Sequence, residues 1–467
     1  LFDPLRETQF VVVRLVWDKE DIGERAIVAI GQDSGQNAGI PEPIFVEAAP
    51  DRGFNYPYYL YAPVRRTDAD PVPLLVQPNN TGSPTDDFGR HRHAARSRMS
   101  DGSGRYISDE LSVPLLMPVF PRPRTEPVDA SHYVHALDVT TLEIDGGPLE
   151  RVDLQLHRMV RDAQRRLDAR SYPVREKIML NGFSAGGTFV NRFAALHPDL
   201  VISVTAGGVN GMPLLPVEEA RGRTLPYHIG IADLEDLTGE PFDREAFRTV
   251  NQFLYIGELG GHDTIPYTDA WTDRDRAQLA LDVYGTDMVD ERMRYSRQVY
   301  DEVGCPAVFR IYPEKGHNPR PARDHLVEFH RLSMAGESID RFRATVDNVP
   351  HLHAAIRYEP ESPAVGEQVA FDATTSSIHG RELVDFAWSF SDGRTTTGPL
   401  VSHTFETAGG HNVRLTITDD EGETYESVEQ LQVRGKSEGS GAGFGIIGTV
   451  AGLGVGVAIG VRGALRD

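Results

Sequence analysis

Ser184 lies in the segment LNGFSAGGTF (180–189), and its setting predicts a nucleophile. The pentapeptide GFSAG (182–186) follows a short apolar run, KIML (177–180), and precedes an amphipathic helical pattern. A sharp turn between a strand and a helix strains the serine backbone and points the positive end of the helix at the reacting centre. The alternative is a glycine-rich connection with an incidental serine. The strand and helix on either side favour the nucleophile.

A serine nucleophile needs a base, and His317 is the predicted one. It lies in IYPEKGHNPRP, directly after the apolar run AVFRIY (307–312). A loop at the carboxyl end of a parallel strand reaches the crevice where ligands bind. His262 is the main alternative. His325 and His330 lie on the helix that follows, and we expect them to be packing or surface residues.

The group that orients the base is predicted to be Asp263. In the chain order serine, acid, histidine, the acid follows the penultimate strand, here FLYI (253–256). In many enzymes with this chain order, the acid lies three residues after the glycine that closes the strand. Here that position is Gly260, which cannot act as an acid. Asp263 comes three residues later, and Glu258 is the alternative. A helix cap is the other role that Asp263 could have.

The oxyanion of a tetrahedral intermediate needs two backbone donors. The first is predicted to be the N–H of Ala185, directly after the nucleophile. The second is expected in the loop QPNNTGS (77–83), after an early strand, where Asn80 is the choice and Asn79 and Thr81 are close alternatives.

These residues need a sheet to position them. Continuous apolar runs separated by helical patterns predict buried parallel strands with helices on both faces. The region from 46 to 345 therefore reads as one α/β domain, whereas residues 1–45 have no clear assignment. The predicted strands are 73–76, 114–120, 177–180, 201–206, 253–256 and 307–312.

From residue 350 to 434 the pattern changes to strict alternation, as in Val413, Leu415 and Ile417. Alternation with frequent turn clusters predicts antiparallel strands in a β-sandwich. The motifs AWSFSDG, SHTFETAG and HNVRLTITDDEG resemble the polycystic-kidney-disease (PKD) type of immunoglobulin-like domain. The resemblance implies that Trp388 is the core tryptophan and that the module is an extracellular spacer or adhesion unit.

A Gly/Ser linker (435–441) precedes AGFGIIGTVAGLGVGVAIGV (442–461), which carries no charge over 20 residues. This length suits a transmembrane helix, and Arg462 and Arg466 suit a cytoplasmic flank. The layout resembles C-terminal sorting signals of archaeal surface proteins. It predicts a membrane anchor with the α/β and β domains outside the cell. A hydrophobic tail that packs on the protein is the alternative.

The composition limits the partners and the chemistry. The chain of 467 residues has 69 acidic and 47 basic residues and a net charge of −22, which disfavours binding to nucleic acid. The chain has only four lysines beside these acidic residues, a composition that resembles that of salt-adapted proteins from halophilic microbes. A GC-rich genome that favours arginine codons is the alternative. Cys305 is the single cysteine, so one chain can form neither an internal disulfide nor a thiolate metal cluster.

The α/β region as a whole resembles the α/β-hydrolase superfamily. YYLYAPV (58–64), GFSAGG (182–187) and YIGE (255–258) are similar to its esterase branch, which includes polyhydroxyalkanoate depolymerases and feruloyl esterases. The resemblance implies two-step hydrolysis of small or polymeric esters through an acyl-enzyme, with no metal or organic cofactor. A serine peptidase of the same fold and a non-catalytic surface adhesion protein are the alternatives. The oligomeric state stays open.

Overall fold

The structure is a computed structural model that describes residues 37–66, 69–266, 270–349, 352–353, 356–374, 376–378, 382–420, 422 and 424–435. The predicted linker after Gly435 and the predicted membrane tail lie outside these residues. Within them, no helix combines the length and the apolar character that a membrane crossing requires.

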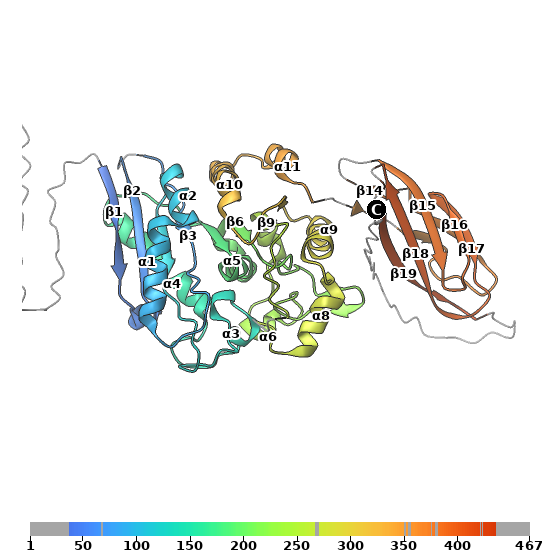
Figure 1. The fold of residues 1–467 in the computed structure, drawn as a ribbon, viewed down its shortest axis with the longest axis horizontal. Coiled ribbons are helices and arrows are strands. Elements are labelled where there is room, and N and C mark those ends of the chain that lie inside the picture. Colours follow the sequence, from blue (N-terminus) through green and yellow to red (C-terminus); the bar gives the residue numbers. More distant parts are fainter. Residues whose placement is uncertain are drawn as a thin grey trace, which may run out of the picture. The chain divides into compact units, whose positions relative to one another are not determined.

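An eight-stranded sheet forms the centre of the first domain, in the order β1-β2-β4-β3-β5-β6-β9-β10 (Figure 1). β2 runs antiparallel to both of its neighbours, and the strands from β4 to β10 are parallel. This order and this single reversed strand are those of the α/β-hydrolase fold. The strands are β1 (Asn37–Val46), β2 (Tyr58–Arg66), β3 (Leu75–Val76), β4 (Leu115–Pro118), β5 (Ile178–Phe183), β6 (Val201–Gly207), β9 (Asn251–Gly257) and β10 (Ala307–Tyr312).

The apolar runs form the inner strands because both faces of the sheet are covered. β3, β4 and most of β5 and β9 are buried, so their side chains need no polar alternation. All six predicted strands are present, and the predicted mostly parallel sheet is confirmed.

Two groups of helices cover the sheet. α1, α2 and α10 contact one another or the strands β2, β3, β6 and β9, whereas α4, α5 and α9 pack on β4, β5, β6 and β10. Because parallel strands are joined by right-handed crossovers, the strand order predicts that the two groups lie on opposite faces of the sheet. Their bounds are α1 (Phe88–Asp101), α2 (Ser103–Leu111), α4 (Val152–Asp168), α5 (Ala185–Leu196), α9 (Arg294–Glu302) and α10 (Arg323–Ala335), with α11 (Asp340–Val346) after them.

The α/β domain begins earlier than the sequence predicted. β1 occupies 37–46 and pairs with β2, so the predicted boundary at residue 46 cuts off an edge strand. Pro41 and Pro43 and two register shifts interrupt its ladder, which hid the strand from pattern analysis.

The connections around β9 are long and have a core of their own. Met212, Leu225, Trp271 and Tyr284 belong to a buried cluster separate from that of the main sheet. The elements of these connections are β7 (Glu219–Ala220), β8 (Arg223–Thr224), α6 (Leu234–Thr238), α7 (Arg244–Phe247), α8 (Arg274–Tyr284) and the π-helix η4 (Met288–Met293).

The second domain is the predicted β-sandwich. One sheet has the order β12-β13-β17 and the other β16-β15-β18-β19. Val413, Leu415 and Ile417 are buried, and Trp388 lies in the same core with its indole N–H donating to the Gly398 carbonyl at 2.9 Å. The strands are β12 (Arg357–Glu359), β13 (Gln368–Asp372), β15 (Leu383–Phe390), β16 (Thr395–Thr397), β17 (Leu400–Thr404), β18 (Gly409–Asp419) and β19 (Thr424–Val433), with the small pair β11 (Leu352–His353) and β14 (Ser377–Ile378).

Candidate active site

Ser184 occupies the sharp turn between β5 and α5. Its backbone has φ 59° and ψ −132°, a conformation that residues with a side chain rarely adopt. Such strain persists only where the surroundings enforce it, and it is common at active sites. The Ser184 N–H donates to the Gly207 carbonyl at 2.8 Å, and the Ser184 carbonyl accepts from the Thr188 N–H at 3.0 Å. These bonds hold the turn from both sides.

Gly182 is required for the same turn. A Cβ at this position would lie 2.1 Å from the Gly186 carbonyl oxygen, well inside van der Waals contact. The helix can therefore begin directly after the serine only if residue 182 has no side chain. This contact is the physical reason for the first glycine of the motif.

The serine opens onto a cavity of about 480 Å³. His317, Asn80 and Asp263 contribute to its wall, as do Ala185 and the alternative base His262. The residues chosen from the sequence therefore surround one cavity, although they come from four separate connections: the turn at Ser184 and the loops after β3, β9 and β10. Among the described residues, no hydrogen bond joins Ser184 to His317.

The imidazole of His317 lies between two aromatic rings. The Phe183 ring centroid is 4.6 Å from that of His317, and the His262 ring stacks on it at 4.6 Å with an interplanar angle of 16°. Burial, together with the neighbouring His262, lowers the pKa of His317 to about 4. His317 is therefore neutral at pH 7 and able to accept a proton.

Main-chain contacts hold the loop that carries His317. The Glu258 N–H donates to the Tyr312 carbonyl at 3.1 Å, and the Leu259 N–H donates to the Lys315 carbonyl at 2.8 Å. A Cβ on Gly257 would lie 2.3 Å from the Gly316 carbonyl oxygen. The ends of β9 and β10 thus approach so closely that a glycine is needed between them.

Asp263 does not contact His317 as the sequence predicted. Its carboxylate forms a two-pronged ion pair with Arg292, at 3.0 and 2.8 Å. The Arg292 side chain is fully buried, so its charge requires a carboxylate close by. Asp263 also accepts from the Ile265 N–H at 3.2 Å and so caps a turn, whereas the alternative left open by the sequence was a helix cap; residues 264–266 form a turn and no helix. Within the described part of the chain, no carboxylate hydrogen-bonds to His317.

The alternative acid, Glu258, has a different role again. It is exposed, and its carboxylate accepts from the Glu314 N–H at 2.6 Å. Glu258 therefore braces the histidine loop through the main chain, with no contact to the imidazole.

Asn80 and its neighbours have separate roles. The Asn79 amide is buried and bonds both polar groups of the Phe120 main chain, at 2.8 and 3.0 Å. The Thr81 N–H donates to His135 at 3.4 Å. The Asn80 N–H has no acceptor among the described residues, and Asn80 is the member of this trio that lines the cavity. The Ala185 N–H, at the first position of α5, has no partner within its helix.

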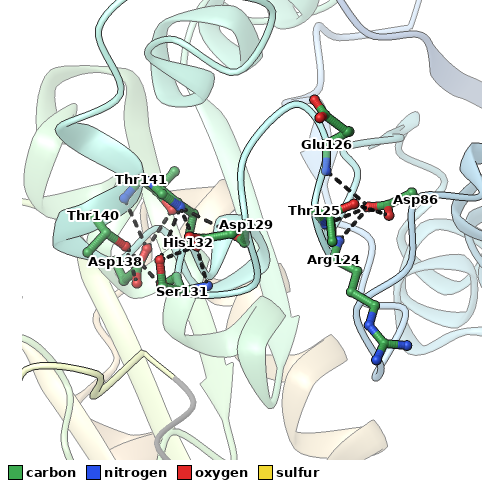
Figure 2. Close-up of polar contacts among 10 residues, drawn as sticks. All are labelled: Asp86, Arg124, Thr125, Glu126, Asp129, Ser131, His132, Asp138, Thr140 and Thr141. Atoms are coloured by element: carbon green, nitrogen blue, oxygen red, sulfur yellow. Dashed lines mark hydrogen bonds and ion pairs between the residues drawn. The ribbon is translucent and has the colours of Figure 1, made fainter.

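The loop between β4 and α4 forms another wall and is braced by carboxylates (Figure 2). Asp86 accepts from the N–H groups of Arg124, Thr125 and Glu126, at 2.7, 2.9 and 3.3 Å, and from the Thr125 hydroxyl. These bonds hold the pKa of Asp86 well below its usual range. The loop is thus fixed where it leads to the cavity residues Tyr133 and Ala136.

Sequence patterns did not identify Tyr133, Trp271 and Arg192, which also line the cavity. Tyr133 and Trp271 lie in loops without a motif, so nothing in the sequence marked them. Arg192 did carry a signal, because it lies about two turns along the helix that begins directly after Ser184.

The solved structures to which this chain is similar include two enzymes that are covered over almost their whole length. A poly(aspartic acid) hydrolase from Sphingomonas is 16% identical, with 62% of this chain and 98% of that chain covered and a TM-score of 0.40. A poly(3-hydroxybutyrate) depolymerase from Bordetella parapertussis is 18% identical, with coverages of 65% and 94% and a TM-score of 0.39.

Among curated proteins, a microbial collagenase of Vibrio alginolyticus is 35% identical over 60 residues, which are 13% of this chain. The chain spans only 7% of the length of that relative. Residues 354–433 match the family model of the PKD domain. The β-sandwich that follows the α/β-hydrolase fold is therefore a PKD domain.

Proposed function

We propose that the α/β domain is a serine hydrolase that cleaves carboxylic esters through an acyl-enzyme. The observation that carries the proposal is the strained turn at Ser184, which opens onto a cavity shared with a neutral, partly buried His317. Backbone strain costs free energy, and residues that keep it cluster at functional sites. A neutral imidazole in the same cavity supplies the base that a serine nucleophile needs.

In the first step, the Ser184 Oγ attacks the ester carbonyl carbon while His317 takes the hydroxyl proton. The negative charge that develops on the carbonyl oxygen is stabilised by the N–H groups of Ala185 and Asn80. The carbon–oxygen bond to the alcohol then breaks, and His317 returns the proton to the leaving alkoxide. An ester of Ser184 and a free alcohol remain.

In the second step, water attacks the acyl-enzyme with His317 as base. The carboxylic acid leaves, and Ser184 regains its proton. Asp263 is bound to Arg292 in the free protein, so it would have to leave that pair to support the imidazolium form of His317. This mechanism needs only Ser184, His317 and the N–H groups of Ala185 and Asn80.

A fluorophosphonate probe tests the nucleophile directly. We expect wild-type protein to be labelled on Ser184, and the Ser184→Ala variant to be unlabelled and to lose about 10⁶ in kcat on p-nitrophenyl esters. Unchanged turnover in purified Ser184→Ala protein would overturn the proposal. Esters of graded chain length then define the acyl preference.

We further propose that the protein acts at the cell surface and is anchored by residues 442–461. The PKD domain and the uncharged segment after it support this location. The full chain should fractionate with membranes, a chain ending at Gly435 should not, and protease added to intact cells should reach the hydrolase domain. Protection from the protease would rule out the surface location and leave the esterase proposal intact.

A further inference from the structure

Arg192 is a buried cation in the wall of the catalytic cavity. It lies on α5, eight residues after Ser184 and four after Thr188, and all three residues line the cavity. Only 4% of Arg192 is exposed. Helical residues four apart share a face, so Arg192 and Thr188 lie on one side of α5, which begins directly after Ser184.

The described residues accept only one hydrogen bond from the guanidinium of Arg192. One N–H donates to the Ala136 carbonyl at 2.8 Å, and a guanidinium has five N–H donors. Among the described residues, no carboxylate lies within ion-pair distance of Arg192. Burial lowers the pKa of Arg192.

Asp138 is the carboxylate whose negative charge acts on the pKa of Arg192, but its oxygens already accept hydrogen bonds from other residues (Figure 2). They accept from the Thr141 N–H at 3.1 Å, from the Thr141 hydroxyl at 2.5 Å and from the Thr140 hydroxyl at 2.9 Å. The carboxylate caps α3 (Val139–Leu142). Asp138 therefore offsets the charge of Arg192 only at a distance.

A buried cation without a carboxylate partner is unfavourable unless a ligand completes it. We propose that the cavity accepts half-esters of short dicarboxylic acids, and that Arg192 binds the free carboxylate while Ser184 attacks the ester. The inference rests on the proposed function and names its substrate class. A carboxylate is the anion whose geometry a guanidinium matches with two parallel hydrogen bonds.

The spacing along α5 suits a short diacid. Eight residues of helix separate the two Cα atoms by about 12 Å along the axis. Helical side chains lean toward the helix N-terminus, so the arginine side chain shortens that gap. A glutarate half-ester is therefore a suitable probe.

The kinetic test compares two matched esters: mono-p-nitrophenyl glutarate, which carries a carboxylate, and its neutral methyl-capped analogue. Wild-type protein should favour the anionic ester in kcat/KM, mainly through KM. In Arg192→Met that preference should fall by about 10- to 100-fold, the usual effect of losing a hydrogen-bonded charge. Arg192→Lys, which keeps the charge, should retain part of the preference. A role limited to holding Ala136 would alter both esters equally.

Arg98→Met is the matched control. Arg98 lines a second cavity of about 230 Å³ together with Arg320 and Arg323, and it does not line the catalytic cavity. If the anionic preference falls in Arg98→Met and persists in Arg192→Met, the charge is read in the second cavity and the proposal is wrong. Equal turnover of both esters by wild-type protein would also overturn it.

Binding to Ser184→Ala protein separates this inference from the proposed function. Calorimetric titration should show that monomethyl glutarate binds and dimethyl glutarate does not. In the double variant that carries both Ser184→Ala and Arg192→Met, the binding should be lost. If no ester is hydrolysed but this Arg192-dependent binding appears, the carboxylate site stands and the esterase proposal falls. If neutral esters are hydrolysed but no such binding appears, the esterase proposal stands and the carboxylate site falls.

Discussion

The loops after β9 and β10 leave neighbouring parallel strands at the same edge of the sheet, but different forces hold them. Main-chain hydrogen bonds hold the loop after β10 against the end of β9. The backbone of this loop also approaches Gly257 closely, which restricts the position of His317. Side-chain contacts hold the loop after β9, and two of the partners, Arg292 and Asn210, come from other segments. Asp263 binds Arg292, and Thr264 accepts from Asn210 at 2.8 Å and from Trp271 at 3.1 Å.

This difference decides which site residue a sequence can reveal. A loop held by its neighbouring strand depends on local features, such as a glycine at a strand end. A loop held by a distant arginine depends on a contact that no local pattern announces. His317 was predicted from a local feature, its place directly after the apolar run AVFRIY (307–312), whereas the contact between Asp263 and Arg292 has no local feature to mark it.

The largest expected effect concerns the histidine loop. His317→Ala should lose about as much activity as Ser184→Ala, and the double variant should lose no more, because nucleophile and base act as a unit. His262→Ala is the matched control: it removes the stacked ring and keeps the base. Steady-state kinetics on a p-nitrophenyl ester measures each variant. An inactive His262→Ala beside an active His317→Ala would reverse the assignment.

The second prediction concerns the loop after β9. Asp263→Asn removes the carboxylate partner of a fully buried arginine, which should lower the free energy of unfolding by up to about 3 kcal/mol. Glu258→Gln, at an exposed site, should lower it by less than about 1 kcal/mol. Urea unfolding measures both.

A different result would move Asp263 into the catalytic set. If Asp263→Asn is as stable as wild type but loses about 10⁴ in kcat, the carboxylate orients His317 during the reaction. The free structure would then represent a resting pair that opens when substrate binds.

The pH profile sharpens the same comparison. Burial and His262 lower the pKa of His317 to about 4, so the base becomes protonated, and inactive, only as the pH falls through that value. The kcat/KM should therefore be constant from about pH 5 to 7 and fall near pH 4, because this ratio reports the free enzyme. An acid limb at pH 6 to 7 would show that a carboxylate raises the pKa of His317. The His262→Ala variant should shift the limb upward.

The sequence predicted most of the fold because its signals are local. Continuous apolar runs marked the inner strands, and alternation around Val413 marked the sandwich. Edge strand β1 was missed because its prolines and register shifts disrupt the pattern. The serine, the histidine and the cavity-lining Asn80 came from strand-end loops, whose positions follow from the order of the sheet. Arg192 was overlooked, although its spacing from Ser184 was visible, because an arginine on a helix is usually at the surface.

The smallest expected effect concerns the boundary between the two domains. The α/β domain has its own buried core, which extends to Val349, and the PKD domain has another around Trp388. Domains with separate cores can fold separately. A chain ending at Val349 should therefore hydrolyse p-nitrophenyl esters with an unchanged kcat/KM, and Ser184→Ala in the same short chain gives the background rate. Circular dichroism and thermal unfolding establish that the short chain is folded. A folded but inactive short chain would show that the PKD domain contributes to catalysis, and the division into a catalytic and an accessory domain would then be wrong.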